Sequence, residues 1–244
     1  MAEHANSPIT QFEIKTLVPI RIGDLDVSFT NSSLLMLITI AAATVFLVGG
    51  MRKHAMVPGR WQLTAEISYE FIAGLLRDNV GKEGRPYFPL VFSLFMFILF
   101  GNMLGMLPYS FTFTSHIIVT FALAIAIFIG VTVLAFIKHG VGFFKFFAPE
   151  GIPILIMPLL IPIEIISYLS RPISLSVRLF ANMMAGHTLM KVFGGFVVQM
   201  KWFGILPLTF LVALTGLEML IAFLQAYVFA ILTCLYINDA LHMH

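Results

Sequence analysis

The sequence predicts an all-α polytopic membrane protein, and two observations carry that prediction. Of its 244 residues, 59% are hydrophobic and only 11% are charged, whereas soluble domains carry about 25% charged residues. Uninterrupted apolar blocks of about 20 residues recur, and this length crosses a hydrocarbon core of about 30 Å. An ordinary soluble domain is therefore excluded. Because no basic stripe with interleaved aromatic residues occurs, nucleic acid is not an expected partner.

Five apolar segments are expected to cross the lipid bilayer, in a single membrane domain of residues 32–244 that follows an outer-face segment of residues 1–31. The first begins near Asn31 or Ser32, which are good N-cap residues, and ends at a glycine pair. The second contains Gly101 and Gly105 in a GxxxG spacing, which favours close approach of another helix. The predicted ranges are 32–50, 88–108, 115–138, 152–194 and 204–240.

Between the first two segments, residues 61–81 predict an amphipathic helix. Apolar residues recur on one face and polar residues share another: Leu63, Ile67, Phe71 and Leu75 on the first, and Gln62, Glu66, Glu70 and Arg77 on the second. Such a helix is suited to lie along the membrane surface, and packing on a soluble partner is the alternative.

The last two segments are too long for ordinary spans. They hold 43 and 37 residues, so as helices they would reach about 64 and 55 Å, roughly twice the hydrocarbon thickness. Folding each into two spans would need a polar turn, and the nearest candidate is the stretch after Pro172. We therefore expect two steeply tilted, kinked helices packed as an antiparallel hairpin.

Charges in the loops predict the orientation. Basic residues gather on one side of the predicted spans, while the loops on the other side, 108–115 and 195–203, carry almost none. The positive-inside rule then places the N-terminus outside and the C-terminus in the cytoplasm. The basic residues are Arg52, Lys53, Arg60, Lys82, Arg85, Lys138 and Lys145.

The long segments carry polar groups that are costly at membrane depth. Arg178 keeps its charge in any protein environment, and an intramembrane arginine costs about 2.5–3.5 kcal/mol on insertion scales. Glu164, Arg171 and Arg178 recur every seven residues, as do Glu218, Gln225 and, two repeats on, Asp239, so each series follows one helix face. A partner for Arg178 on another subunit is the sharper hypothesis, and pairing with Glu164 or Glu218 is the alternative.

Two proton routes follow from these residues. Glu218 and His187 can both titrate and predict a relay from the outer face, with Asn182 and Gln225 ordering water; a static His–Glu bond and interhelical amide bonds are the alternatives. Glu164, Ser167 and Tyr168 are expected at a cytoplasmic mouth near Arg171, although Glu164 also suits a helix start. The single cysteine, Cys234, forms no disulfide framework. Because no metal, haem or nucleotide motif occurs, we expect no metal, no cofactor and no covalent catalysis.

The two motifs "RPISLSVRLFANMMAGH" and "GLEMLIAFLQAYVF" resemble the signature of subunit a of rotary ATP synthases. The stretches "GNMLGMLPYSFTFTSH" and "NSPITQFEI" are similar to its alphaproteobacterial and mitochondrial branch. Arg178 matches the family's essential arginine, Gln225 its partner glutamine, and Asn182 the adjacent asparagine. Many bacterial members have Glu where this chain has His187, and His where it has Glu218, which supports the two being neighbours.

The resemblance implies a five-spanning, non-catalytic stator subunit. It would translocate protons through two offset half-channels beside a ring of c subunits, each with a membrane carboxyl group, and would contact b-type subunits of the peripheral stalk. A secondary proton-coupled transporter is the main alternative, but no internal repeat of the kind such transporters show is found. A membrane anchor of a redox complex would not need Arg178. A bacterial inner membrane is the expected location, with the mitochondrial inner membrane as the alternative.

Overall fold

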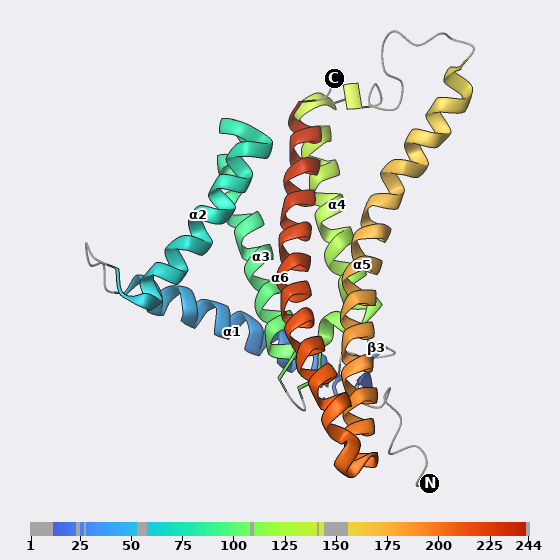
Figure 1. The fold of residues 1–244 in the computed structure, drawn as a ribbon. Helices are drawn as coiled ribbons and strands as arrows, with labels where there is room; N and C mark the ends of the chain where they lie inside the picture. The colour runs from blue at the N-terminus through green and yellow to red at the C-terminus, as the bar shows by residue number, and fades with distance from the viewer. Residues whose placement is uncertain are drawn as a thin grey trace.

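The computed structural model describes residues 12–22, 25–26, 28–52, 58–107, 110–140, 142–143 and 156–242. Within these ranges the chain is built from long helices: α1 (Asn31–Met51), α2 (Arg60–Val80), α3 (Phe88–Gly105), α4 (Ile117–His139), α5 (Met157–Gln199) and α6 (Ile205–Leu241). The short 3-10 helices η3 (Gly81–Tyr87), η4 (Phe113–Ser115) and η6 (Lys201–Gly204) connect some of them. Figure 1 shows α3, α4, α5 and α6 running along one another, with α1 lying across them.

Five helical stretches of the described chain are long and apolar enough to cross a membrane: 31–51, 60–105, 117–139, 157–199 and 202–241. The second combines α2, η3 and α3, and its charged residues all lie in α2 and η3. The fold class expected from the sequence, an all-α polytopic membrane protein, is therefore confirmed.

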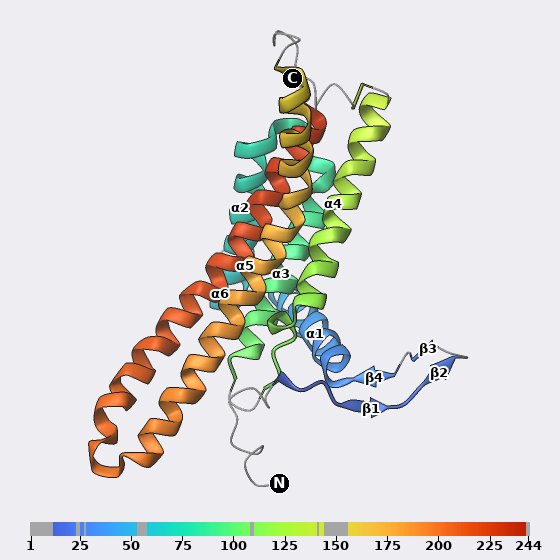
Figure 2. The same ribbon diagram turned by 90° about the vertical axis from the view of Figure 1, so that its right-hand side faces the viewer.

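The N-cap of α1 is Thr30, one residue before the two residues expected from the sequence. The side chain of Thr30 accepts a hydrogen bond from the backbone N–H of Ser33 and is the N-cap. Asn31 instead binds the N-terminal segment, because its side chain accepts from Lys15 N and donates to Glu13 O. That segment forms two short antiparallel pairs, β1 (Thr16–Val18) with β4 (Phe29–Thr30) and β2 (Arg21–Ile22) with β3 (Leu25–Asp26), which extend away from the helices (Figure 2).

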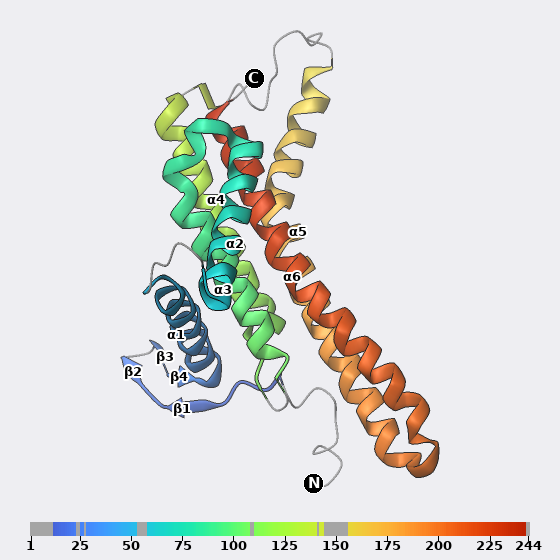
Figure 3. The ribbon, with the colours of Figure 1, turned by 60° about the vertical axis from the view of Figure 1, so that its left-hand side comes forward.

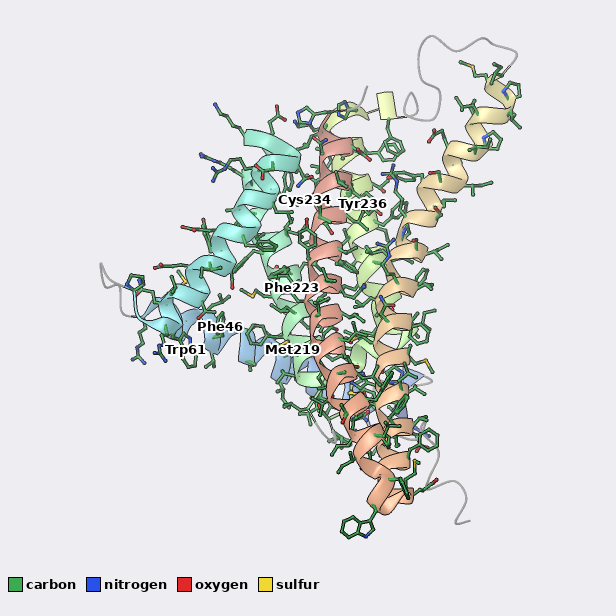
Figure 4. The ribbon with its side chains drawn as sticks, in the orientation of Figure 1. Phe46, Trp61, Met219, Phe223, Cys234 and Tyr236 are labelled. Carbon is green, nitrogen blue, oxygen red and sulfur yellow. The ribbon has the colours of Figure 1, made fainter. Side chains whose placement is uncertain are left out.

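Helix α2 has one face against the protein and another exposed. Ala65, Ile72 and Leu76 are buried in the core, while Leu63 and Ile67 from the predicted apolar stripe are exposed. The face of α2 that packs on the protein is therefore not the predicted stripe. Where α1 and α2 meet, the indole of Trp61 donates a 3.0 Å hydrogen bond to Phe46 O. The centres of the two rings are 6.2 Å apart, and Figure 4 labels both residues at this contact.

The core lies where α6 packs against α3, α2 and α4. A stripe of small residues on α6, Ala222, Ala226, Ala230 and Cys234, has no exposed surface, and small side chains allow helices to approach closely. Asn102 of α3 donates a 3.3 Å hydrogen bond to Ala222 O across this contact. Figure 3 shows α3 and α6 passing close to each other, with α1 and the strands on the opposite side of α3 from the α5–α6 pair.

The last two helices form the expected long antiparallel pair (Figures 1 and 2). Helix α5 is continuous over 43 residues through Pro162 and Pro172, and α6 over 37 residues. At about 1.5 Å per residue they fit a hydrocarbon core of about 30 Å only if they are strongly inclined. The turn between them is shorter than the predicted 195–203 loop, because α5 continues through Gly194 and Gly195 to Gln199. Of the predicted fourth segment, residues 152–155 lie outside the described residues.

Candidate functional site

A buried imidazole and a buried carboxyl group meet between α5 and α6. His187 is 6% exposed and Glu218 only 3% exposed, and His187 Nδ1 lies 2.5 Å from Glu218 Oε1. Neither Glu218 oxygen has a hydrogen bond of good geometry within the described chain, and His187 Nδ1 also lies 3.0 Å from Met183 O. The carboxyl group therefore keeps free capacity to exchange a proton with a third group.

The residue before the histidine makes room for this pair. A Cβ atom placed on Gly186 would lie 2.7 Å from Glu218 Oε1 and 3.0 Å from its Cδ. The side chain of Glu218 therefore lies directly over the backbone of α5, which only a glycine allows at this distance.

A third element closes the site: the segment of residues 110–116 that joins α3 to α4. Thr112 is 2% exposed, and its Oγ1 lies 2.8 Å from His187 Nε2 and 3.1 Å from Gly105 O. His187 Nε2 itself lies 3.0 Å from Gly105 O. The last carbonyl of α3, the threonine hydroxyl and the histidine ring thus form a closed triangle beside Glu218.

The GxxxG glycines of α3 hold this segment in place. A Cβ on Gly105 would lie 2.7 Å from Thr112 Oγ1, and a Cβ on Gly101 would lie 2.4 Å from the ring of Phe113. The spacing predicted close approach of another helix, and the nearest atoms to both glycines belong to the 110–116 segment, which includes the 3-10 helix η4, rather than to one of the long helices. A side chain at either position would push Thr112 or Phe113 out of the core.

The remaining residues expected on the outer route lie on the same two helices. Gln225 is 8% exposed, seven residues after Glu218 on α6, and Asn182 on α5 is half-buried. Neither makes a hydrogen bond to another residue that the structure describes. Phe12 packs its ring 6.4 Å from that of His187, so this cluster lies at the end of the pair nearest the N-terminal segment.

A second polar cluster lies toward the C-terminal end of α6. Arg171 Nη1 donates a 2.9 Å hydrogen bond to Asp239 Oδ2, and its guanidinium lies 5.4 Å from the ring centre of Tyr168 and 5.1 Å from that of Tyr236. The hydroxyl of Tyr168 is 2.7 Å from Thr132 Oγ1 of α4. Figure 4 labels Tyr236 on α6, close to Cys234 in the upper half of the helix.

This cluster borders a small cavity. Tyr168, Arg171, Tyr236 and Asp239 line about 20 Å³ of free space, which is room for about one water molecule. The two other residues expected here lie nearby on α5: Glu164 is half-buried and Ser167 is exposed. Glu164 makes no ion pair within the described chain, so the carboxylate that neutralises Arg171 is Asp239.

Arg178 lies between the two clusters. It is exposed and makes no hydrogen bond or ion pair with any residue that the structure describes, which excludes Glu164 and Glu218 as its partners there. Ser174, Ala181 and Ala185 share its face of α5 and are exposed too. A permanent cation is thus presented on an open surface with small side chains around it.

Comparison with known proteins decides the family. A model of the family described as ATP synthase A chain matches residues 33–238. The chain belongs to the ATP synthase A chain family. Proteins named ATP synthase subunit a from Paramagnetospirillum magneticum and Rhodospirillum rubrum are each 58% identical over 98% of the chain, which covers 99% and 100% of their lengths. The corresponding protein of Pelagibacter ubique is 57% identical, with 98% and 99% covered. The resemblance stated from the motifs is confirmed.

Sequence patterns alone missed three residues of the outer cluster: Phe12, Gly105 and Thr112. The available signal was the stretch "SFTFTS" (110–115), in which hydroxyl residues alternate with phenylalanine soon after Gly105 at the end of an apolar helix. No group of three or more His, Cys, Asp or Glu side chains that could hold a metal ion occurs in the part of the chain that the structure describes.

Proposed function

We propose that this chain is the proton-translocating stator subunit of the membrane sector of an ATP synthase, with two offset half-channels that load and unload a ring of c subunits. One observation carries the proposal. The outer cluster at His187 and the inner cluster at Arg171 are sixteen residues apart on α5, about 24 Å along its axis. Arg178 lies between them, exposed and without an ion pair among the described residues.

The outer half-channel brings protons to the ring. His187 and Glu218 are the titratable pair, since a carboxyl and an imidazole 2.5 Å apart can exchange a proton. Gln225 lies seven residues further along α6, about 10 Å, on the way toward Arg171 and Asp239. Asn182 and Gln225, which have no hydrogen-bond partner in the described chain, order the water that takes the proton from Glu218 to the ring carboxyl.

The inner half-channel releases protons to the cytoplasm. Asp239 and Arg171 form its fixed ion pair, Tyr168 and its small cavity hold water, and Glu164 and Ser167 lie at the mouth. Because Asp239 neutralises Arg171, Arg178 is left as the cation that faces the ring.

Arg178 prevents a direct leak between the two routes. An arginine stays charged, so a ring carboxyl that passes it is stabilised in its ionised form and cannot carry a proton straight across. Each proton must therefore travel around with the ring, and the gradient becomes rotation. The potential supplies about 2.3 kcal/mol per charge and 100 mV. The small residues Ser174, Ala181 and Ala185 let a ring helix approach this face.

The same proposal sets partners and location. The c ring lies against the Arg178 face, b-type stalk subunits hold the chain stationary, and the chain itself catalyses no covalent step. The relatives compared above are bacterial, which favours a bacterial inner membrane over the mitochondrial one. The N-terminal segment faces the outside and the C-terminus the cytoplasm.

Substitution of Arg178 tests the proposal. In membrane vesicles that contain the whole complex, Arg178→Ala should abolish proton-driven ATP synthesis and ATP-driven acidification. Proton leak, measured after the catalytic head is removed, should persist or rise. Arg178→Lys should fail as well, because a desolvated lysine can lose its proton and lacks the planar fork of arginine.

Arg77→Ala is the matched control, since Arg77 is an exposed arginine of α2 outside both clusters, and it should synthesise ATP normally. Robust ATP synthesis by assembled Arg178→Ala complexes would overturn the proposal. Partial rescue by Arg178→Lys would instead mean that charge alone, without the arginine geometry, forms the barrier.

A further inference from the structure

Thr112, Gly105 and His187 offer more hydrogen-bond donors and acceptors than a single protonation state of His187 can use. The carbonyl oxygens of Met183 and Gly105 only accept hydrogen bonds, and they lie 3.0 Å from Nδ1 and Nε2 of His187 respectively. Both ring nitrogens can donate at once only in the charged imidazolium. The observed positions therefore satisfy every hydrogen of a protonated His187.

The same positions also satisfy a neutral ring. When Nε2 has no hydrogen it needs a donor, and Thr112 Oγ1 lies 2.8 Å away. When Nε2 carries a hydrogen, that hydroxyl can donate to Gly105 O at 3.1 Å instead, and a carbonyl oxygen has two lone pairs with which to accept from both groups. Rotation of one O–H bond thus converts one hydrogen-bond set into the other without moving a heavy atom.

We propose that Thr112 is a positioning residue of the proton pathway: its hydroxyl switches between His187 Nε2 and Gly105 O, and so holds the His187 ring in one position beside Glu218 in both protonation states. The inference rests on the proposed function and adds a residue from the α3–α4 segment to it. Without the hydroxyl of Thr112, the ring of His187 would have a hydrogen-bond partner at Nε2, namely Gly105 O, only while the ring is charged.

The surroundings of Thr112 support a fixed hydroxyl. Phe113, Thr114 and Ser115 are all less than 5% exposed, and the hydroxyl of Ser115 donates to Thr112 O. Gly105 ends α3, so its carbonyl has no backbone donor within the helix. The negative end of the helix dipole also interacts favourably with a cation at this position.

Removal of the hydroxyl should change the pH dependence in a defined direction. In Thr112→Val the neutral ring loses its donor at Nε2, while the charged ring keeps Gly105 O, so protonated His187 is favoured. One neutral hydrogen bond changes such an equilibrium about fivefold, or about 0.7 pH unit. The pH at the outer face that gives half-maximal ATP synthesis should therefore rise by about that amount, and the maximal rate should fall because the proton is released less readily.

Other titratable groups near His187 must stay constant in this comparison. They are Glu218 on α6, His116 in the α3–α4 segment, Lys191 on α5 and Glu13 next to Phe12; α3 contains no titratable side chain. Since every variant in the series keeps them, a difference between variants belongs to residue 112.

The experiment uses inverted vesicles with the complete complex, whose interior corresponds to the outer face. The interior pH is varied before a jump to alkaline buffer with ADP and phosphate, and initial ATP synthesis is recorded. Thr112→Ser keeps the hydroxyl and should retain the wild-type profile. Thr114→Val is the matched control, because Thr114 is buried to the same degree but its hydroxyl has no partner within the described chain, and it should leave the profile unchanged.

An assembled Thr112→Val complex with the wild-type rate and pH profile would overturn the inference, as would a Thr112→Ser profile shifted as far as that of Thr112→Val. If Thr112→Val does not assemble, Thr112→Ala removes the hydroxyl without adding bulk and carries the same expectation. Glu218→Gln separates the two proposals. Its inactivity together with a neutral result at Thr112 refutes only the switch, whereas normal synthesis in Glu218→Gln refutes the proton pathway itself.

Discussion

A single methyl group at position 186 should disturb proton transfer without touching a titratable residue. In Gly186→Ala the new Cβ would lie 2.7 Å from Glu218 Oε1, so the carboxyl group must withdraw by roughly 0.7 Å to reach an ordinary contact of 3.4 Å. The 2.5 Å approach between Oε1 and His187 Nδ1 would be lost with it, because the carboxyl is confined between α5 and α6.

The size of the effect follows from two opposing terms. Overpacking of a filled interior costs about 1–3 kcal/mol, while replacing a mid-helix glycine by alanine gains about 0.5–1 kcal/mol. The net loss of stability is then at most about 2.5 kcal/mol, so the complex should assemble. A misplacement of about 1 Å at a reacting group can reduce a rate about 100-fold. We therefore expect proton-driven ATP synthesis to fall at least about tenfold.

The assay is ATP synthesis in vesicles, normalised to the amount of assembled complex. Gly195→Ala on the same helix is the matched control, because a Cβ there meets no atom within 4 Å, and it should be active and slightly more stable. Wild-type rates in assembled Gly186→Ala complexes would refute the reasoning, since they would mean that the close contact of Glu218 with α5 has no part in proton transfer.

Two further predictions concern the cytoplasmic side. In a Cys234→Ala background, which removes the only native cysteine, Glu164→Cys and Ser167→Cys should react with hydrophilic thiol reagents added from the cytoplasmic side. Reaction only from the outer side would reverse the assignment of the inner mouth. The second concerns the ion pair of Glu83 with Lys138, 2.8 Å apart: the hydrogen bond and charge of Lys138 hold the pKa of Glu83 below its ordinary value. Its contribution to stability is therefore present above the unfolded pKa of the carboxyl and lost as the pH falls through the folded value. The melting temperatures of wild type and Glu83→Gln should converge as the pH is lowered from about 7 toward 4, and a constant difference would count against the pair.

Residue spacing predicted much of the helical architecture, because apolar length and seven-residue polar series are local properties of the chain. The two long segments could not be divided into separate spans, and they fold as continuous helices despite Pro162 and Pro172. The pairing of His187 with Glu218 was also predictable, since both are titratable residues on the two predicted hairpin helices. Ends of helices were less predictable: α5 continues past the glycine pair at 194 and 195, where a helix end is common but not obligatory.

Which residues contact each other across long distances in the sequence could be learned only from the packed structure. From the sequence, either Glu164 on the same helix or Asp239 on the last helix could pair with Arg171. Only the fold shows that the partner is Asp239. In the same way the spacing of Gly101 and Gly105 predicted a close contact, but only the fold shows that Phe113 and Thr112 of the connecting segment make it. A periodicity identifies which residues share a face and leaves open what that face meets.

By itself the sequence determined a membrane protein of long apolar helices, the identity of the charged residues within them, and the family whose arginine and glutamate–glutamine motifs it carries. The tertiary structure decided which of these charges are neutralised. It pairs Arg171 with Asp239, brings His187 against Glu218 and Thr112, and leaves Arg178 exposed without a partner in the described chain. The physical reason is that the charge of a side chain, and the free-energy cost of burying it in a membrane, are properties of the single residue. Neutralisation requires two groups within a few ångströms, and that proximity arises only when distant segments pack together.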